Sequence, residues 1–195
     1  MKKYFSFLAV LLFYINVNAG EWNVDTQNEN EVRFLSHTVT LIKDFEFEGI
    51  TDNIDGYLYW EDDSLFLNNE LYFVVDLNTF ETGIKKRDQD MREVVLETAK
   101  WQTTNFTGKI VHFEKMDTTV TAYRVNSKGK LSLHGVEKEI EVPGKIIFHS
   151  GNIRVQAGFG FLITDYKIEV PSILVAKVAE KIKIKLDFYL LPVNN

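Results

Sequence analysis

Apolar and polar residues alternate along most of the chain with a period of two. Between residues 152 and 163 one face carries only apolar side chains, whereas the other carries Arg154, Gln156 and two glycines. The segment 180–191 repeats this pattern, with lysines and an aspartate on its polar face. This period is typical of strands with one buried and one solvated face. The same reasoning predicts further strands near residues 31–42, 44–49, 54–61, 71–77, 104–115, 118–126, 129–134 and 138–149.

Turn-forming residues at 127–129 (Ser-Lys-Gly) and 143–144 (Pro-Gly) separate some of these strands. Eight or more antiparallel strands satisfy two architectures, a two-sheet sandwich or a closed barrel. Gly158 and Gly160 share the outer face of a long strand and would let it bend sharply, as closure requires. We therefore predict an all-β protein with one or two short helices, built as an extended antiparallel barrel.

Two segments break the alternation and predict the helices. In 82–98, Asp88 is a candidate cap, an apolar stripe contains Met91 and Val94 with Val95, and the stripe ends near Glu97. In 170–181, a proline suits the first helical turn and apolar residues follow at helical spacing.

The first nineteen residues have the pattern of a secretory signal peptide. Two lysines precede an apolar stretch from Tyr4 to Ile15, and small residues flank a predicted cleavage site after Ala19. An uncleaved membrane anchor is disfavoured because the apolar stretch is too short. The remaining residues, 20–195, are expected to form one domain that is periplasmic or secreted.

Charge limits the classes of partner. Loss of Lys2 and Lys3 with the signal peptide takes the formal net charge from −6 to −8. An acidic protein of this kind is a poor ligand for nucleic acid or for an anionic membrane surface, since both require a basic footprint. We therefore expect neither nucleic-acid binding nor stable membrane insertion. The pattern leaves the oligomeric state open.

Two motifs resemble the YceI-like family. They are TGIKKRDQDMREVVLETAKW at residues 82–101 and KGKLSLHGVEKEIEVPGKI at residues 128–146. The resemblance implies a lipocalin-like barrel that is exported and holds a long isoprenoid, such as a polyprenyl lipid or a quinone. One feature departs from the family, in which many members carry Asp-x-x-His-Ser before the first long strand. Here Asp25 is followed by TQNENEVRF, so any head-group role of that His-Ser pair is unfilled.

These patterns select candidate ligand-binding residues. Arg87 and Arg92 are candidates for contact with a ligand head group at the barrel mouth. Their alternative role is structural, in a charged helix tied to the barrel by arginine–carboxylate contacts. The apolar lining predicted from the inward stripes comprises Phe45, Phe47, Phe73, Val75, Val155, Phe159, Phe161, Ile184 and Phe188.

The sequence shows no pattern typical of catalysis or of a metal site. No nucleophile stands beside a base, and the four histidines lack zinc-site spacing and any cysteine neighbour. His134, followed by Gly135, is better explained as a turn residue that satisfies a backbone carbonyl. We therefore expect a non-enzymatic lipid-binding protein without a metal or other cofactor. The alternatives are a barrel filled by its own side chains, with a structural or partner-binding role, and, last, an enzyme.

Overall fold

The computed structural model describes residues 20–40, 45–61, 66–149, 151–169, 172–173, 176–178 and 180–193. The predicted signal peptide, residues 1–19, lies outside the described residues.

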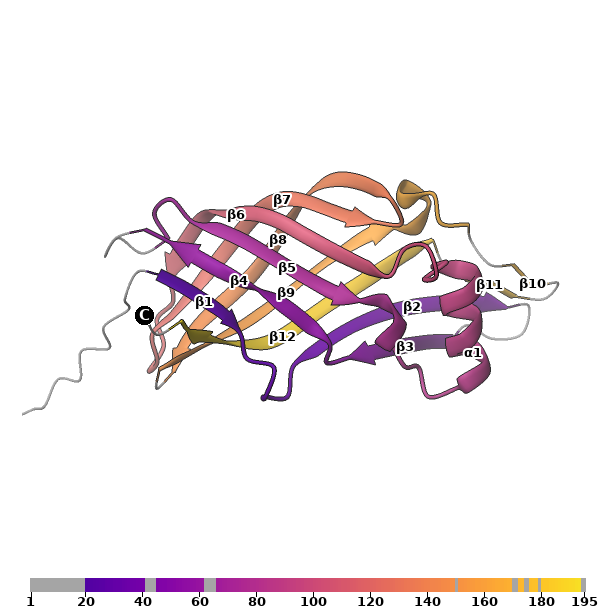
Figure 1. Ribbon diagram of the computed structural model, residues 1–195, viewed down its shortest axis with the longest axis horizontal. Helices are drawn as coiled ribbons and strands as arrows, with labels where there is room; N and C mark the ends of the chain where they lie inside the picture. The colour runs from indigo at the N-terminus through magenta and orange to yellow at the C-terminus, as the bar shows by residue number, and fades with distance from the viewer. Residues whose placement is uncertain are drawn as a thin grey trace, which may run out of the picture.

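Within the described residues, eight antiparallel strands close into a barrel, which confirms the predicted fold class (Figure 1). Closure follows from pairing of the first strand with the last, at Trp22 opposite Pro192. Each strand turns its apolar stripe inward, as the alternation predicts. In their order around the barrel the strands are β1 (Gly20–Val24), β4 (Ile54–Trp60), β5 (Glu70–Asp76), β6 (Thr103–Lys115), β7 (Ala122–Leu133), β8 (Val136–His149), β9 (Asn152–Leu162) and β12 (Lys181–Pro192).

Two further strands lengthen the wall at one end of the barrel. Strand β2 (Glu31–Thr40) continues the line of β1 along β12, and β3 (Phe45–Thr51) pairs with β2 and leads into β4. The loop between β1 and β2 is held by Asp25 and Asn30. The Asn30 side chain donates to the backbone carbonyl of Asp25 at 2.8 Å and accepts from the backbone N–H of Tyr189 at 3.1 Å. These contacts give the loop that follows Asp25 a structural role.

The predicted helix at 170–181 is wrong for the described residues. Strands β10 (Ser172–Ile173) and β11 (Ala176–Val178) form a hairpin there, and β11 pairs with β2. The free edge of β2 offers backbone hydrogen-bond partners that helical spacing in the sequence cannot reveal.

The helix predicted within 82–98 is confirmed. It comprises α1 (Lys85–Asp90) and a π-helical turn, η2 (Met91–Val95), and it ends before Glu97, whose φ is +45°. Short 3-10 turns lie at η1 (Leu77–Thr79) and η3 (Ile163–Tyr166). Asp88 is not the cap that we predicted, because the helix starts three residues earlier. Its carboxylate instead reaches back to accept the backbone N–H of Thr82 at 2.9 Å and the Thr82 hydroxyl.

Two predicted turns are also wrong. Residues 127–129 and 143–144 lie within the continuous strands β7 and β8, where pairing with neighbours on both sides overrides local turn preference. The chain turns instead at His134 and Gly135, with φ of +51° and +72°. Two successive residues with positive φ are typical of the tight two-residue hairpin.

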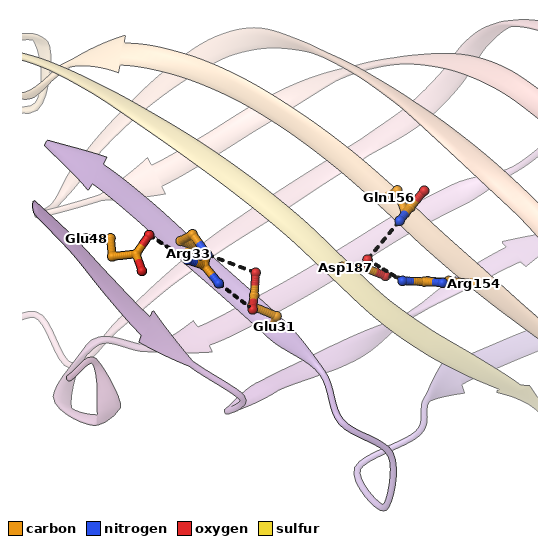
Figure 2. A network of polar contacts seen from close by, with 6 residues as sticks. All are labelled: Glu31, Arg33, Glu48, Arg154, Gln156 and Asp187. Carbon is orange, nitrogen blue, oxygen red and sulfur yellow. Dashed lines mark hydrogen bonds and ion pairs between the residues drawn. The ribbon is translucent and has the colours of Figure 1, made fainter. Parts of the chain in front are cut away.

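Polar networks brace the outer face on both sides of β12 (Figure 2). On β2, Arg33 contacts Glu31 at 2.8 Å and Glu48 of β3 at 2.5 Å. Asp187 of β12 accepts hydrogen bonds from Arg154 and Gln156 of β9, at 2.7 and 2.8 Å. Both networks join neighbouring strands and leave the interior to apolar side chains.

Candidate functional site

The barrel encloses an elongated cavity of about 760 Å³. Its wall consists of the inward stripes of the strands, together with residues of the helix. This volume lies within the range of cavities that hold small molecules in proteins.

All nine residues predicted as apolar lining border this cavity. Phe188 is buried, whereas Phe45 is 46% exposed because it lies at the open end. Contact of these side chains with a ligand stays a prediction. The nine residues are Phe45, Phe47, Phe73, Val75, Val155, Phe159, Phe161, Ile184 and Phe188.

The structure separates the two arginines predicted at the mouth. Arg87 borders the cavity, where its guanidinium lies 4.7 Å from the centre of the Phe47 ring. It donates to the Thr82 hydroxyl and to the Thr82 carbonyl, each at 2.8 Å. Arg92 points away from the cavity toward backbone carbonyls of Asn78 and Phe80, at 3.4 and 3.3 Å.

The charge on Arg87 has no carboxylate partner among the described residues. Its described contacts are the two to Thr82 and the face of Phe47. The neighbouring Lys86 and Asp90 pair with each other at 2.6 Å on the exposed side of the helix. Of the three charged residues that border the cavity, Lys86, Arg87 and Asp90, Arg87 is therefore the one without a described ion-pair partner.

Two glycines make room for the ring of Phe106, which borders the cavity. Gly108 of β6 and Gly129 of β7 face each other across the two strands. A Cβ atom at either position would lie within 3.0 Å of the Phe106 ring tip. Phe106 therefore lies flat along the wall over these glycines instead of projecting into the cavity.

Several lining residues were not among the sequence candidates. Strands β6, β7 and β8 contribute Phe106, Val125 and Ile146, and the helix contributes Met91. The period-2 alternation of these strands marks their inward residues. The turns that we predicted within β7 and β8 divided each strand into shorter segments and obscured this alternation. Ser36 of β2 also borders the cavity, and its buried hydroxyl has no hydrogen-bond partner among the described residues.

His134 lies in a turn and contacts a backbone carbonyl, as we predicted, and it also contacts a carboxylate. Its Nδ1 lies 3.3 Å from the carbonyl oxygen of Tyr166, and its Nε2 lies 2.8 Å from a carboxylate oxygen of Glu97. These contacts tie the β7–β8 hairpin to the end of the helix and to η3. Burial raises the pKa of the Tyr166 hydroxyl to about 12.

In the described part of the chain, no group of three or more His, Asp or Glu side chains could hold a metal ion.

None of the helices in the described residues is long and apolar enough to cross a membrane.

Comparison with solved structures finds the same barrel in several proteins. The polyisoprenoid-binding domain from Saccharophagus degradans matches with a TM-score of 0.67 and 17% identity, over 90% of this chain and 100% of that one. BcnA of Burkholderia cenocepacia gives 0.66 and 14%, over 85% and 98%. The YceI protein of Campylobacter jejuni gives 0.57 and 13%, over the whole of both chains. At these identities the likeness establishes the fold alone.

A search of curated protein sequences found no match. The YceI-like domain, by contrast, matches as a family model over residues 22–190, which is most of the chain. The match includes the barrel strands, the helix and the His134 hairpin. The chain therefore belongs to the YceI-like domain family.

Proposed function

We propose that this protein binds a long-chain isoprenoid, or a similar apolar lipid such as a quinone, inside its barrel. The observation that carries the proposal is the cavity of about 760 Å³, whose wall is formed almost entirely by aliphatic and aromatic side chains. The relative from Saccharophagus degradans, described as a polyisoprenoid-binding domain, supports this class of ligand.

Burial of apolar surface would supply the driving force. Each methylene group that leaves water contributes about 0.8 kcal/mol. Association and the ordering of a flexible chain cost several kcal/mol, so a short chain would bind weakly. A chain long enough to fill the cavity offsets these costs without any hydrogen bond. The proposal therefore favours long, flexible hydrocarbon chains over compact polar ligands.

Arg87 would set the direction of the bound lipid. A guanidinium without a described carboxylate partner attracts an anionic or carbonyl head group, and hydrogen bonds to a charged group are the stronger ones. Since Arg87 lies at the helix end of the cavity, the head group would lie there and the tail would extend into the barrel.

The cavity disfavours the alternative of a barrel filled by its own side chains. A filled interior would leave no space of this volume, since protein cores are close-packed. We assign the protein a binding role and no catalytic one. We further propose that it acts in the periplasm or outside the cell, because residues 1–19 have the pattern of an export signal.

A cavity-filling variant tests the proposed function. Val155→Trp adds an indole ring to the cavity wall, so we expect bound lipid to be lost while the melting temperature holds or rises. Leu162→Trp on the same strand is the matched control, because Leu162 is 41% exposed and does not border the cavity. Equal lipid content in both variants would contradict the proposal. So would a Val155→Trp protein that is destabilised by overpacking, if the wild type carries no lipid.

A further inference from the structure

The cavity ends at a sharp boundary inside the barrel. On five strands of the barrel wall the last inward residue that borders the cavity is followed by an inward residue that does not. The bordering residues are Leu58 of β4, Val125 of β7, Ile146 of β8, Val155 of β9 and Phe188 of β12. The next inward residues on the same strands are Trp60, Tyr123, Phe148, Ile153 and Leu190. We call this second set the floor.

The floor is densely packed. Trp60 is fully buried and stacks on Trp22 of β1, with ring centres 5.8 Å apart and planes at 9°. Phe66 contacts Trp60 edge-on at 5.5 Å between ring centres. Ile153 and Leu190 are also fully buried. Such packing is typical of a protein core, in which voids as large as a water molecule are few.

A buried amide fixes the side of the floor next to β6. The Asn69 side chain donates to the carbonyls of Phe66 and Ile110, at 2.8 and 3.0 Å, and accepts the backbone N–H of Ile110 at 2.6 Å. Asn69 is 6% exposed, and β6 shifts its register beside this contact. These bonds join the residues just before β5 to the wall of the barrel beside the floor.

The opposite end of the cavity is open. Phe45 and Val94 border the cavity there and are 46% and 70% exposed. The charged residues that border the cavity, Lys86, Arg87 and Asp90, all belong to the helix at this end. The cavity is therefore a tube with one mouth and one blind end.

We propose that the floor sets the greatest length of apolar chain that the protein accepts, so that it selects its ligands by length. This inference rests on the proposed function. A chain that enters tail-first, with its head group near Arg87, buries each added methylene until its end meets Leu58 and Val125. Further methylenes stay in water at the mouth or force the head group away from Arg87.

A length series of ligands tests this inference. The probes are prenyl monophosphates that differ only in the number of isoprene units, measured by competition against one bound fluorescent lipid. Below the limit we expect affinity to rise with length, at most about fourfold for each methylene buried. Above the limit it should stop rising or fall. We call the length at which this happens the break.

Leu58→Ala should move the break to longer chains, because it removes a buried side chain at the blind end. Leu133→Ala is the matched control. Leu133 also is buried and borders the cavity, but it lies at the other end of β7 from the floor. This control should lower affinity at every length and leave the break in place.

Val125→Phe gives a second test that does not depend on making a void. The added ring occupies the blind end, so the break should move to shorter chains. Two results would overturn the inference and leave the proposed function intact. One is an affinity that rises with chain length over the whole series, without a break. The other is a break that moves equally in Leu58→Ala and Leu133→Ala. Absence of binding at every length would overturn the proposed function itself, and the inference with it.

Discussion

Arg87 is the residue on which the direction of the ligand depends. We predict that Arg87→Gln lowers affinity for a prenyl phosphate at least tenfold, because a hydrogen bond to a charged group contributes about 1.5–3 kcal/mol. Affinity for the uncharged prenyl alcohol should change little. Competition binding with both ligands measures the difference. Arg92→Gln is the control, since Arg92 does not border the cavity and its described side-chain contacts are with the backbone carbonyls of Asn78 and Phe80, so it should leave both affinities unchanged. An equal loss for both ligands in Arg87→Gln would contradict the head-group role.

Asp88 anchors the helix through the two hydrogen bonds that its carboxylate accepts from Thr82. Asp88 is 6% exposed, so an amide in its place leaves the partly buried N–H and hydroxyl of Thr82 without a charged acceptor. We predict that Asp88→Asn lowers the free energy of unfolding by about 1–3 kcal/mol, measured by urea titration. Asp90→Asn breaks only an exposed ion pair with Lys86 and should have no measurable effect. A helix held by packing alone would give the same stability in both variants.

Asp187 links stability to pH. Burial opposes its ionisation, but hydrogen bonds from Arg154 and Gln156 outweigh burial and hold the pKa of Asp187 below its ordinary value. A pKa that is lower in the folded state adds stability above the unfolded-state pKa, and this is lost as pH falls through the folded value. We therefore predict that the stability difference between wild type and Asp187→Asn is constant from neutral pH to about pH 5 and shrinks below about pH 4. Urea titrations across this range measure it; a difference that persists to about pH 2 would rule out this linkage.

At the scale of elements, the period-2 alternation predicted the barrel strands and their inward faces. It did so because each strand has one apolar and one solvated face, which is a local property of the sequence. The turn at 127–129 was predicted wrongly because Gly129 reads as a turn residue. Gly129 in fact allows a close approach to Gly108, its partner on β6, which lies 21 residues earlier in the chain. The hairpin at β10–β11 depends in the same way on the free edge of β2.

The Gly108–Gly129 pair lets strands β6 and β7 pack closely beneath Phe106. A Cβ atom on Gly129 would lie 2.2 Å from the Thr107 carbonyl oxygen. We predict that Gly129→Ala lowers the free energy of unfolding by about 1–3 kcal/mol, as overpacking does. Thermal unfolding measures the loss. Gly160→Ala is the control, because its nearest contact would be 3.3 Å, and it should stay close to wild type. Equal losses in both variants would contradict a special role for the close Gly108–Gly129 approach, because the effect of Gly→Ala on the unfolded chain is stabilising.

At the scale of the molecule, the sequence predicted which side chains face inward but could not show that they enclose space. The width of the cavity depends on how Phe106 lies over its glycines and on where the floor begins at Trp60. The mouth is formed in part by the helix. The sequence showed that the charged residues of the helix lie close together in the chain, but it did not show that Arg87 borders the cavity and Arg92 does not. These features arise from packing between segments that are far apart in the chain.

The central claim is that the barrel carries an apolar lipid, and native mass spectrometry of the full-length gene product purified from its own host tests it most directly. We predict a mass above that of the protein alone, by the mass of one lipid, and release of a long-chain isoprenoid or similar lipid on organic extraction. The Val155→Trp protein, purified in the same way, should have the mass of the protein alone. A wild-type protein that has no added mass, yields no extractable lipid and takes up none when a prenyl lipid is supplied would contradict the claim.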